Sequence, residues 1–284
     1  MTKRFLLAAL LLLQTAPLPA QENYPVLWEI SGNGIKKPSY LFGTIHVAPI
    51  SLLDSFPQIM RIAERCDFAL FENGGSPIGT VPVRPEVGQP PLDSIFTPEE
   101  YAVVDSFFTA SPHGSIRPHN DDADLLAMLQ VAITMNESNA NAQYDVFDHL
   151  LRFKLYNLNK PIFQLDVVED IEEIKNRMGY RNVAKMLAVV ITSKSTLKEI
   201  IPQESRNHEM YFKKLRYPLN LHQEPDENIA FATVKRNADW LPKIETQIKN
   251  GSCFIAVGLE HLRFRTGLVQ LLKKQGYTLK PVNP

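Results

Sequence analysis

Hydrophobic residues recur at different spacings along the chain, which predicts strands near both ends and helices in the middle. Apolar, β-prone runs at 26–30 and 40–47 flank Gly32-Asn33-Gly34, a sequence typical of a tight hairpin turn. Residues 53–65 instead repeat apolar side chains at helical spacing, and residues 67–72 form a short apolar run that ends in a carboxylate. The first part of the chain is therefore predicted to form a β-hairpin, a helix and a buried strand.

The middle of the chain is predicted to be mostly helical. A loop with several Gly and Pro residues at 73–95 precedes Thr97-Pro98-Glu99-Glu100, a capping box that opens a helix to about Thr109. From about 121 to 250 the spacing is helical, with one short strand at 161–165. The end of the chain returns to β structure, with a strand at 252–257, a helix at about 266–275 and a strand at 277–282.

Strands separated by helices predict an α/β fold, with a central mixed, largely parallel sheet that has helices on both faces. The helical middle, at about 97–250, is predicted to form a lobe inserted into a single domain of residues 21–284. A chain of 284 residues is within the range of one α/β domain. Because ligands bind at the carboxyl ends of strands in such sheets, polar residues at these ends are the candidates for function.

The first twenty residues have the form of a secretory signal peptide. Lys3 and Arg4 precede an apolar run at 5–13, and the small Ala20 stands just before Gln21. This run is shorter than the ~20 residues that span a bilayer, and no later stretch reaches that length. We expect cleavage after residue 20 and a soluble exported protein, periplasmic or secreted, with no transmembrane segment once the signal is removed.

The composition excludes two broad classes of protein. Hydrophobic residues make up 44% and charged residues 21%, which excludes a mostly disordered chain. The formal net charge is −1, so the chain has no overall field that would attract nucleic acid or an anionic membrane. We therefore expect no nucleic-acid partner.

The two cysteines, Cys66 and Cys253, are too few for a disulfide framework or a structural zinc site. Both are predicted at the amino-terminal end of the sheet, in neighbouring strands. Export favours a disulfide between them, whereas bridges directly across neighbouring strands are strained. We favour two buried free thiols.

Three predicted strand ends carry polar residues. Two have the form Gly-x-x-His, with Gly43 before His46 and Gly258 before His261, and the third ends at Glu72. Two histidines and a carboxylate at neighbouring strand ends could ligate one divalent metal and leave positions open for water, as in hydrolytic metal sites. The pattern therefore indicates a metal site built from His46, His261 and Glu72.

Structural explanations compete with this interpretation. A single Gly-x-x-His motif carries little information, and Glu72 could serve as a helix cap or an ion-pair partner. No His-Glu-x-x-His, Gly-x-Ser-x-Gly, Walker or dinucleotide motif is present in the sequence. The remaining histidines are expected in loops or on solvated helix faces: His113, His119, His149, His208 and His222.

Further short motifs are spread along nearly the whole chain after the predicted signal peptide. They are Trp28-Glu29-Ile30, Pro38-Ser39-Tyr40-Leu41-Phe42-Gly43-Thr44-Ile45-His46-Val47, Phe71-Glu72, Lys160-Pro161-Ile162, Arg236-Asn237, Phe254-Ile255-Ala256-Val257-Gly258-Leu259-Glu260-His261-Leu262, Gly267-Leu268 and Gly276-Tyr277-Thr278-Leu279-Lys280-Pro281-Val282. With these motifs the chain resembles the TraB/GumN family, whose animal relatives are the Tiki proteases. The wider superfamily is similar to the erythromycin-esterase and haem-binding ChaN-like folds.

The resemblance implies a metal-dependent, peptidase-like site that contains His46, His261, Glu72 and the Arg236-Asn237 pair. It also implies manganese or cobalt as the divalent metal. Arg236 would then stabilise an oxyanion or pair with Glu72, and Asn237 would be an orienting donor. Without the resemblance, Arg236-Asn237 would be an ordinary surface pair on a helix.

Three positions depart from the family pattern. Glu260 stands before the second histidine in place of a small residue, and Lys235 precedes Arg236 in place of Glu. Both changes could alter activity or metal choice. Asp166 stands in a Leu-Asp-Val sequence where the family has Leu-Glu-Thr, which exchanges one carboxylate for another.

Taken together, the sequence predicts an exported metal-dependent hydrolase, peptidase-like, in which a metal-activated water acts at the paired Gly-x-x-His motifs. Glu72 would be a third ligand or the general base, and Arg236 is expected to point into the cleft from the helical lobe. The alternative is a non-catalytic periplasmic protein that binds haem, a metal or a peptide in the same cleft. An interaction scaffold with a degenerate site is a third possibility.

Overall fold

The computed structural model describes residues 22–73, 80–84, 89–140 and 143–283. The predicted signal peptide of residues 1–20 lies outside this part of the chain, as does much of the predicted loop at 73–95. Within the described ranges, no helix combines the length and the apolar character that crossing a membrane requires.

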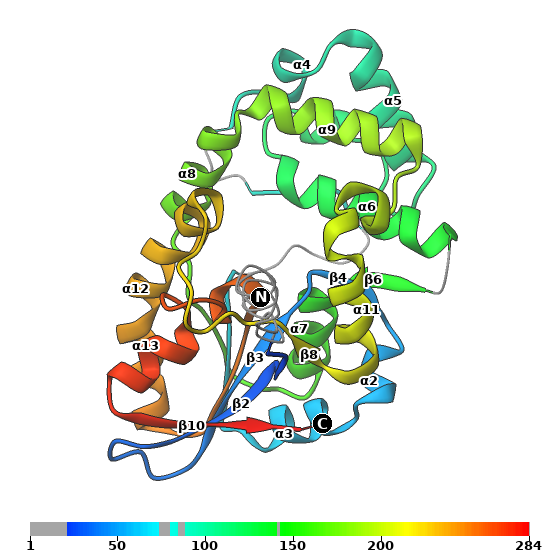
Figure 1. Cartoon of the computed structure of the whole chain (residues 1–284). Helices are drawn as coiled ribbons and strands as arrows, with labels where there is room; N and C mark the ends of the chain where they lie inside the picture. The colour runs from blue at the N-terminus through cyan, green and yellow to red at the C-terminus, as the bar shows by residue number, and fades with distance from the viewer. Residues whose placement is uncertain (1–21, 74–79, 85–88, 141–142, 284) are drawn as a thin grey trace, which may run out of the picture.

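The fold is built on a mixed six-stranded sheet in the order β10-β2-β3-β9-β5-β7 (Figure 1). The pairs β3–β9, β9–β5 and β5–β7 are parallel, and β2 and β10 run antiparallel at the other side of the sheet. This is the mixed, largely parallel α/β sheet that the sequence predicts. The strands are β2 Leu27–Gly32, β3 Ser39–Thr44, β5 Phe68–Phe71, β7 Ile162–Gln164, β9 Cys253–Gly258 and β10 Tyr277–Val282.

The predicted hairpin is present as β2 and β3, with Ile30 opposite Ser39. Asn33 and Gly34 both have positive φ at the turn, which asparagine and glycine tolerate best. The second strand is shorter than predicted, since it ends at Thr44 and the chain then forms β4 (Val47–Pro49). β4 leaves the main sheet and pairs with β6 (Tyr144–Val146) in a separate two-stranded sheet.

The helix predicted at 53–65 is two helices, α2 (Leu52–Ser55) and α3 (Gln58–Arg65). Pro57 separates them because proline has no N–H to donate and disfavours helical geometry at the residue before it. The capping box at Thr97 is present as predicted and opens α5 (Pro98–Thr109).

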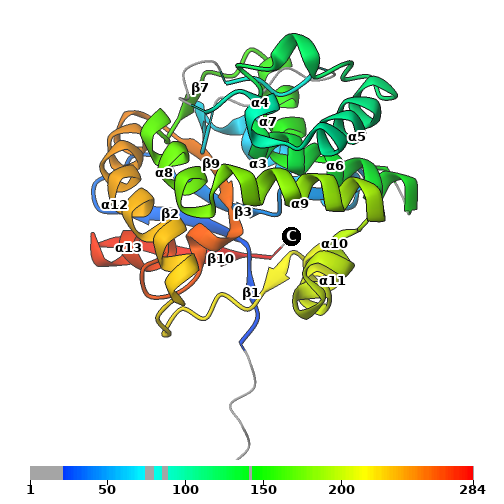
Figure 2. The same ribbon diagram turned by 90° about the horizontal axis from the view of Figure 1, so that it is seen from above.

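Helices cover both faces of the sheet (Figures 1 and 2). α7 (Phe147–Asn157) covers one face, where the Phe147 ring meets that of Phe42 edge to face. α12 (Glu227–Asn250) and α13 (Leu268–Lys274) cover the other face. The main core lies between these layers and contains the fully buried Trp28 and Trp240.

A second hydrophobic core belongs to a helical lobe that lies beyond the carboxyl ends of the parallel strands (Figure 1). Its helices are α4 (Leu92–Ile95), α5, α6 (Leu125–Ala140) and α9 (Tyr180–Ser193), and α8 (Val168–Met178) joins it to the main core. The remaining elements are β1 (Tyr24–Pro25), β8 (Arg216–Tyr217), α10 (Leu197–Ile200), α11 (Ser205–Lys214) and the 3-10 helices Arg117–His119, Pro202–Glu204 and Leu259–Leu262.

Both cysteines are buried and free, as predicted. Cys66 ends α3, and Cys253 begins β9 opposite Phe68. The two cysteines are therefore offset by two residues along the strands, and the Cys66 thiol accepts a hydrogen bond from the Ser252 hydroxyl at 3.4 Å.

Candidate active site at three strand ends

The candidate residues come from the carboxyl ends of three neighbouring parallel strands. His46 lies two residues beyond β3, Glu72 directly follows β5, and His261 lies in the 3-10 helix that follows β9. β9 runs between β3 and β5, so the three ends meet at one edge of the sheet. Glu72 Oε1 and His261 Nε2 are 3.8 Å apart, although the residues are far apart in the sequence.

Gly258 allows Glu72 and His46 to approach each other. A Cβ atom at Gly258 would lie 2.8 Å from Glu72 Oε1 and 3.3 Å from His46 Nε2, so any side chain here would displace the carboxylate or the imidazole. The Gly258 backbone N–H also donates a short hydrogen bond to Glu72 Oε1. The glycine of the second Gly-x-x-His motif is thus needed for the close approach of backbone and side chains.

His46 is held through its Nδ1 atom. This nitrogen lies 2.5 Å from Asp148 Oδ2, and the other oxygen of Asp148 accepts a short hydrogen bond from the Thr44 hydroxyl. Burial lowers the pKa of His46, but the adjacent Asp148 carboxylate outweighs this and raises it to about 9. The Nε2 atom lies on the Gly258 side of the ring, and it would have to release its proton to bind a metal ion.

His261 is buried, and both of its ring nitrogens have protein partners. Nδ1 lies 2.7 Å from Asn237 Oδ1, and Nε2 lies 3.0 Å from Arg236 Nη1. Because a guanidinium only donates, Nε2 must accept, so the ring is neutral with its proton on Nδ1. Burial, with a contribution from Arg236, lowers the pKa of His261 to about 3 against the opposing effect of Glu72, which agrees with a neutral ring. The Trp240 indole stacks on the ring at 4.2 Å between centroids.

Arg236, on α12, joins the carboxylates of the site. Its Nε and Nη2 atoms bind the two Asp166 oxygens at 2.9 and 2.8 Å, and Nη2 also donates to Glu72 Oε2 at 2.7 Å. Burial raises the pKa of Glu72, but Arg236 and the two histidines outweigh this and hold it well below its ordinary value. Of the two roles considered for Arg236, the structure contains the pairing with Glu72.

Asn237 orients His261 and the loop that follows it. Its amide nitrogen donates to the backbone oxygens of His261 at 3.3 Å and Thr266 at 2.9 Å, while its oxygen faces His261 Nδ1. Since Asn237 and Arg236 are adjacent on α12, this helix fixes both ring nitrogens of His261.

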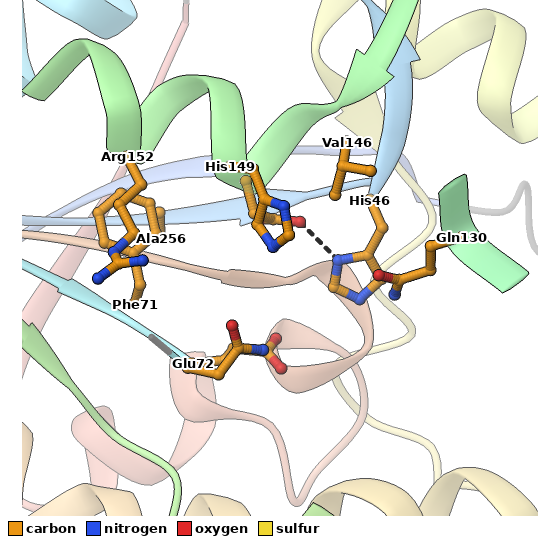
Figure 3. Close-up of a pocket in the computed structure, with 10 residues that line it drawn as sticks. His46, Phe71, Glu72, Gln130, Val146, His149, Arg152 and Ala256 are labelled. Atoms are coloured by element: carbon orange, nitrogen blue, oxygen red, sulfur yellow. Dashed lines mark hydrogen bonds and ion pairs between the residues drawn. The ribbon is translucent and has the colours of Figure 1, made fainter. Parts of the chain in front are cut away.

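A cavity of about 40 Å³ opens beside His46 and Glu72 (Figure 3). Phe71 and Ala256 line it from the strands, while His149 and Arg152 line it from α7. His149 is half-buried in this cavity, so the expectation of a solvated helix face for it is wrong. Burial lowers the pKa of His149.

Several residues of this site were not predicted from the sequence. Asp166 was noted only as a departure from the family pattern, yet it binds Arg236 with both oxygens and accepts from Trp240 Nε1 at 3.0 Å. Its signal was a carboxylate directly after a predicted strand, as for Glu72. Asp148 and Arg152 gave no local signal, because they occupy an ordinary helical stretch.

The other two departures from the family pattern form ion pairs elsewhere. Lys235 pairs with Asp170 at 2.7 Å and Asp239 at 3.0 Å, and Glu260 accepts from Arg263 at 2.6 Å. In the described part of the chain, neither has a hydrogen bond or ion pair with His46, Glu72 or His261.

The residues fit a divalent cation on two conditions, the first being that His46 releases its Nε2 proton. Histidine ligands in metal sites donate the other ring N–H to an oriented acceptor, as Asn237 provides for His261, and Asp148 holds His46 in the same way. Because Gly258 has no side chain, His46 and Glu72 can also lie close together. Arg236, however, occupies Glu72 Oε2 and His261 Nε2, and the described residues contain no group of three or more His, Cys, Asp or Glu side chains that could hold a metal as they stand. His261 fits as a ligand only when Arg236 Nη1 releases its Nε2 atom.

Comparison with known proteins identifies the family. The profile of the TraB/PrgY/gumN family matches residues 26–281, which is nearly the whole described chain. No curated protein and no solved structure matches the chain. The family match includes both Gly-x-x-His motifs, Glu72 and the Arg236-Asn237 pair, so the chain belongs to the TraB/PrgY/gumN family.

Proposed function

We propose that this protein is an exported, divalent-metal-dependent hydrolase with a peptidase-like site. His46, His261 and Glu72 are the proposed ligands, with manganese or cobalt as the metal, and the substrate is a peptide or a related small molecule. The observation that carries the proposal is the meeting of these three side chains at neighbouring strand ends, where each histidine is oriented through its Nδ1 atom.

A divalent cation bound there would supply a Lewis acid that polarises a carbonyl group and makes a water molecule more acidic. Within the chain, Asp148 and Asn237 orient the two imidazoles. Glu72 is held ionised by Arg236, so it is either a ligand or a base that accepts a proton. Arg236 places donors beside Glu72 and His261, where negative charge on a substrate oxygen would be stabilised.

Metal analysis together with a peptide-cleavage screen tests this proposal. The purified protein should bind one divalent metal per chain, and His46→Ala and His261→Ala should each abolish this binding while cooperative thermal unfolding is retained. His222→Ala, at an exposed histidine, is the matched control and should bind metal normally. Unchanged metal stoichiometry in both site variants would refute the assignment of ligands.

The second candidate is a non-catalytic periplasmic protein that binds haem, a metal or a peptide in the same cleft. The observation that favours it is the position of Arg236, which occupies the lone pairs of Glu72 and His261 that a catalytic metal would need. Binding without turnover across a panel of divalent metals and peptides would support this function over hydrolysis.

A further inference from the structure

Arg152 places a cation in the wall of the cavity beside the candidate site. It lies on α7 one turn after Asp148 and contributes to the cavity wall with His149 (Figure 3). Within the described residues it forms no hydrogen bond or ion pair, and its Nε atom is buried without a hydrogen-bond partner. This half-buried guanidinium is therefore desolvated at Nε and has no partner among the described residues, so its other donors can bind an anion.

The carboxylates that line the same cavity are already compensated by other groups. Glu72 accepts from Arg236 and from the Gly258 backbone N–H. Asp148 accepts from the Thr44 hydroxyl and lies against His46 Nδ1. Neither acid is paired with Arg152, so the positive charge of Arg152 remains available to an anion that enters from outside the protein.

The chemistry of the Arg152 side chain indicates which anion it would bind. A guanidinium presents a planar fork of donors that matches the two oxygens of a carboxylate. The same fork also matches two oxygens of a phosphate, which is therefore the competing ligand in the test.

We propose that Arg152 is the anion-binding residue of the cleft and that it holds a carboxylate of the substrate. Two sources share this chemistry, the C-terminal carboxylate of a peptide and the side chain of an acidic residue. Describing the ligand as a substrate rests on the proposed hydrolase function, whereas the carboxylate subsite can be tested by binding alone.

Binding is measured by NMR titration of the purified chain with small probes. N-acetyl-dialanine, with a free carboxylate, is compared with its C-terminal amide, and the N-methylamide of N-acetyl-aspartate is compared with that of N-acetyl-asparagine. Inorganic phosphate is the fifth probe. We expect at least one carboxylate probe to bind more tightly than its amide, and the tighter of the two carboxylates identifies the source.

Variants assign the preference to Arg152. Arg152→Met should weaken binding of the carboxylate probe about 10- to 100-fold, which is the range for a hydrogen bond to a charged group, and leave the amide unaffected. Arg152→Lys keeps the charge and should retain part of the affinity. Arg61→Met removes the same charge from an exposed position on α3 and is the matched control.

Equal affinities for acid and amide, or unchanged carboxylate binding in a folded Arg152→Met protein, would overturn the proposal. Should Arg152→Met not fold, Arg152→Lys takes its place. A carboxylate affinity of Arg152→Lys equal to that of the parent would then overturn the proposal too, because lysine lacks the guanidinium fork. Tighter binding of phosphate than of either carboxylate would overturn the assignment of a carboxylate. Carboxylate preference without any metal-dependent cleavage would leave the subsite in place and refute only the hydrolase function.

Discussion

Asp166 and Arg236 form a buried bidentate ion pair, with Nε–Oδ1 and Nη2–Oδ2 distances of 2.9 and 2.8 Å. Asp166 follows β7 at the edge of the sheet, and Arg236 lies on α12, so the pair joins the sheet edge to the helix that carries Asn237. Trp240 donates to the same carboxylate and stacks on His261. The position of His261 therefore depends on a carboxylate outside both Gly-x-x-His motifs.

Replacing Arg236 by Met should strongly destabilise the protein. The substitution leaves Asp166 and Glu72 without their cation, and removing one partner of a buried ion pair costs about 3–5 kcal/mol. Urea unfolding at neutral pH measures this loss. Arg181→Met is the matched control. It breaks a bidentate surface ion pair with Glu100 and should alter the free energy of unfolding far less. A folded Arg236→Met protein as stable as its parent would contradict the buried pairing.

Replacing Asp148 by Asn should weaken metal binding without removing a ligand. Asp148 orients His46 through Nδ1, and loss of such an outer partner lowers metal affinity by roughly 10- to 100-fold. Metal titration of the parent and the variant measures the change. Asp54→Asn, at an exposed position on α2, provides the control and should bind as the parent does. Equal metal affinities in all three proteins would show that Asp148 does not orient His46 for metal binding.

The sheet and its three polar ends could be predicted from the sequence because their signals are local. Continuous apolar runs predict buried strands, and Gly43, Gly258 and Glu72 stand directly at or beside the ends of these runs. Parallel strands place their carboxyl ends at one edge, so proximity of the histidines and Glu72 followed from topology. The break at Pro57 has a local cause as well, because proline disfavours helical geometry at the residue before it.

The groups that surround these residues could not be predicted in the same way. Asp148, His149 and Arg152 belong to the first turns of α7 and line the cavity, and Phe147 at the start of this helix packs on Phe42. Helical periodicity separates buried from exposed faces, but it does not say which part of the sheet a helix will cover. The two nitrogen partners of His261 likewise depend on how α12 crosses the strand ends.

Stability at acid pH should depend on Asp105. Burial raises the pKa of Asp105, but hydrogen bonds from Ser115, the Ile116 backbone N–H and Arg117 outweigh this and lower it overall. A lowered folded-state pKa stabilises the protein above the unfolded pKa of about 4. This contribution is lost as the pH falls through the folded-state value.

Urea unfolding of the parent and Asp105→Asn at pH 7, 4 and 3 tests this dependence. The parent should lose more stability than the variant between pH 4 and 3, because only the parent has the carboxylate to protonate. At pH 7 the variant should be the less stable of the two, since the hydrogen bonds from Arg117 and Ile116 are weakened. Parallel stability curves for the two proteins across this range would contradict the assignment to Asp105.

The two cysteines should react as free thiols only after unfolding. Cys66 and Cys253 are both buried, and burial raises the pKa of each thiol, so the reactive thiolate is scarce in the folded state. Their offset of two residues along parallel neighbouring strands places the side chains out of register for a direct bridge. Titration of the unreduced protein with a thiol reagent should count two thiols in denaturant and none on the same timescale without it. A count of zero in denaturant would mean that the pair is oxidised, and Cys66→Ser would then restore one reactive thiol at Cys253.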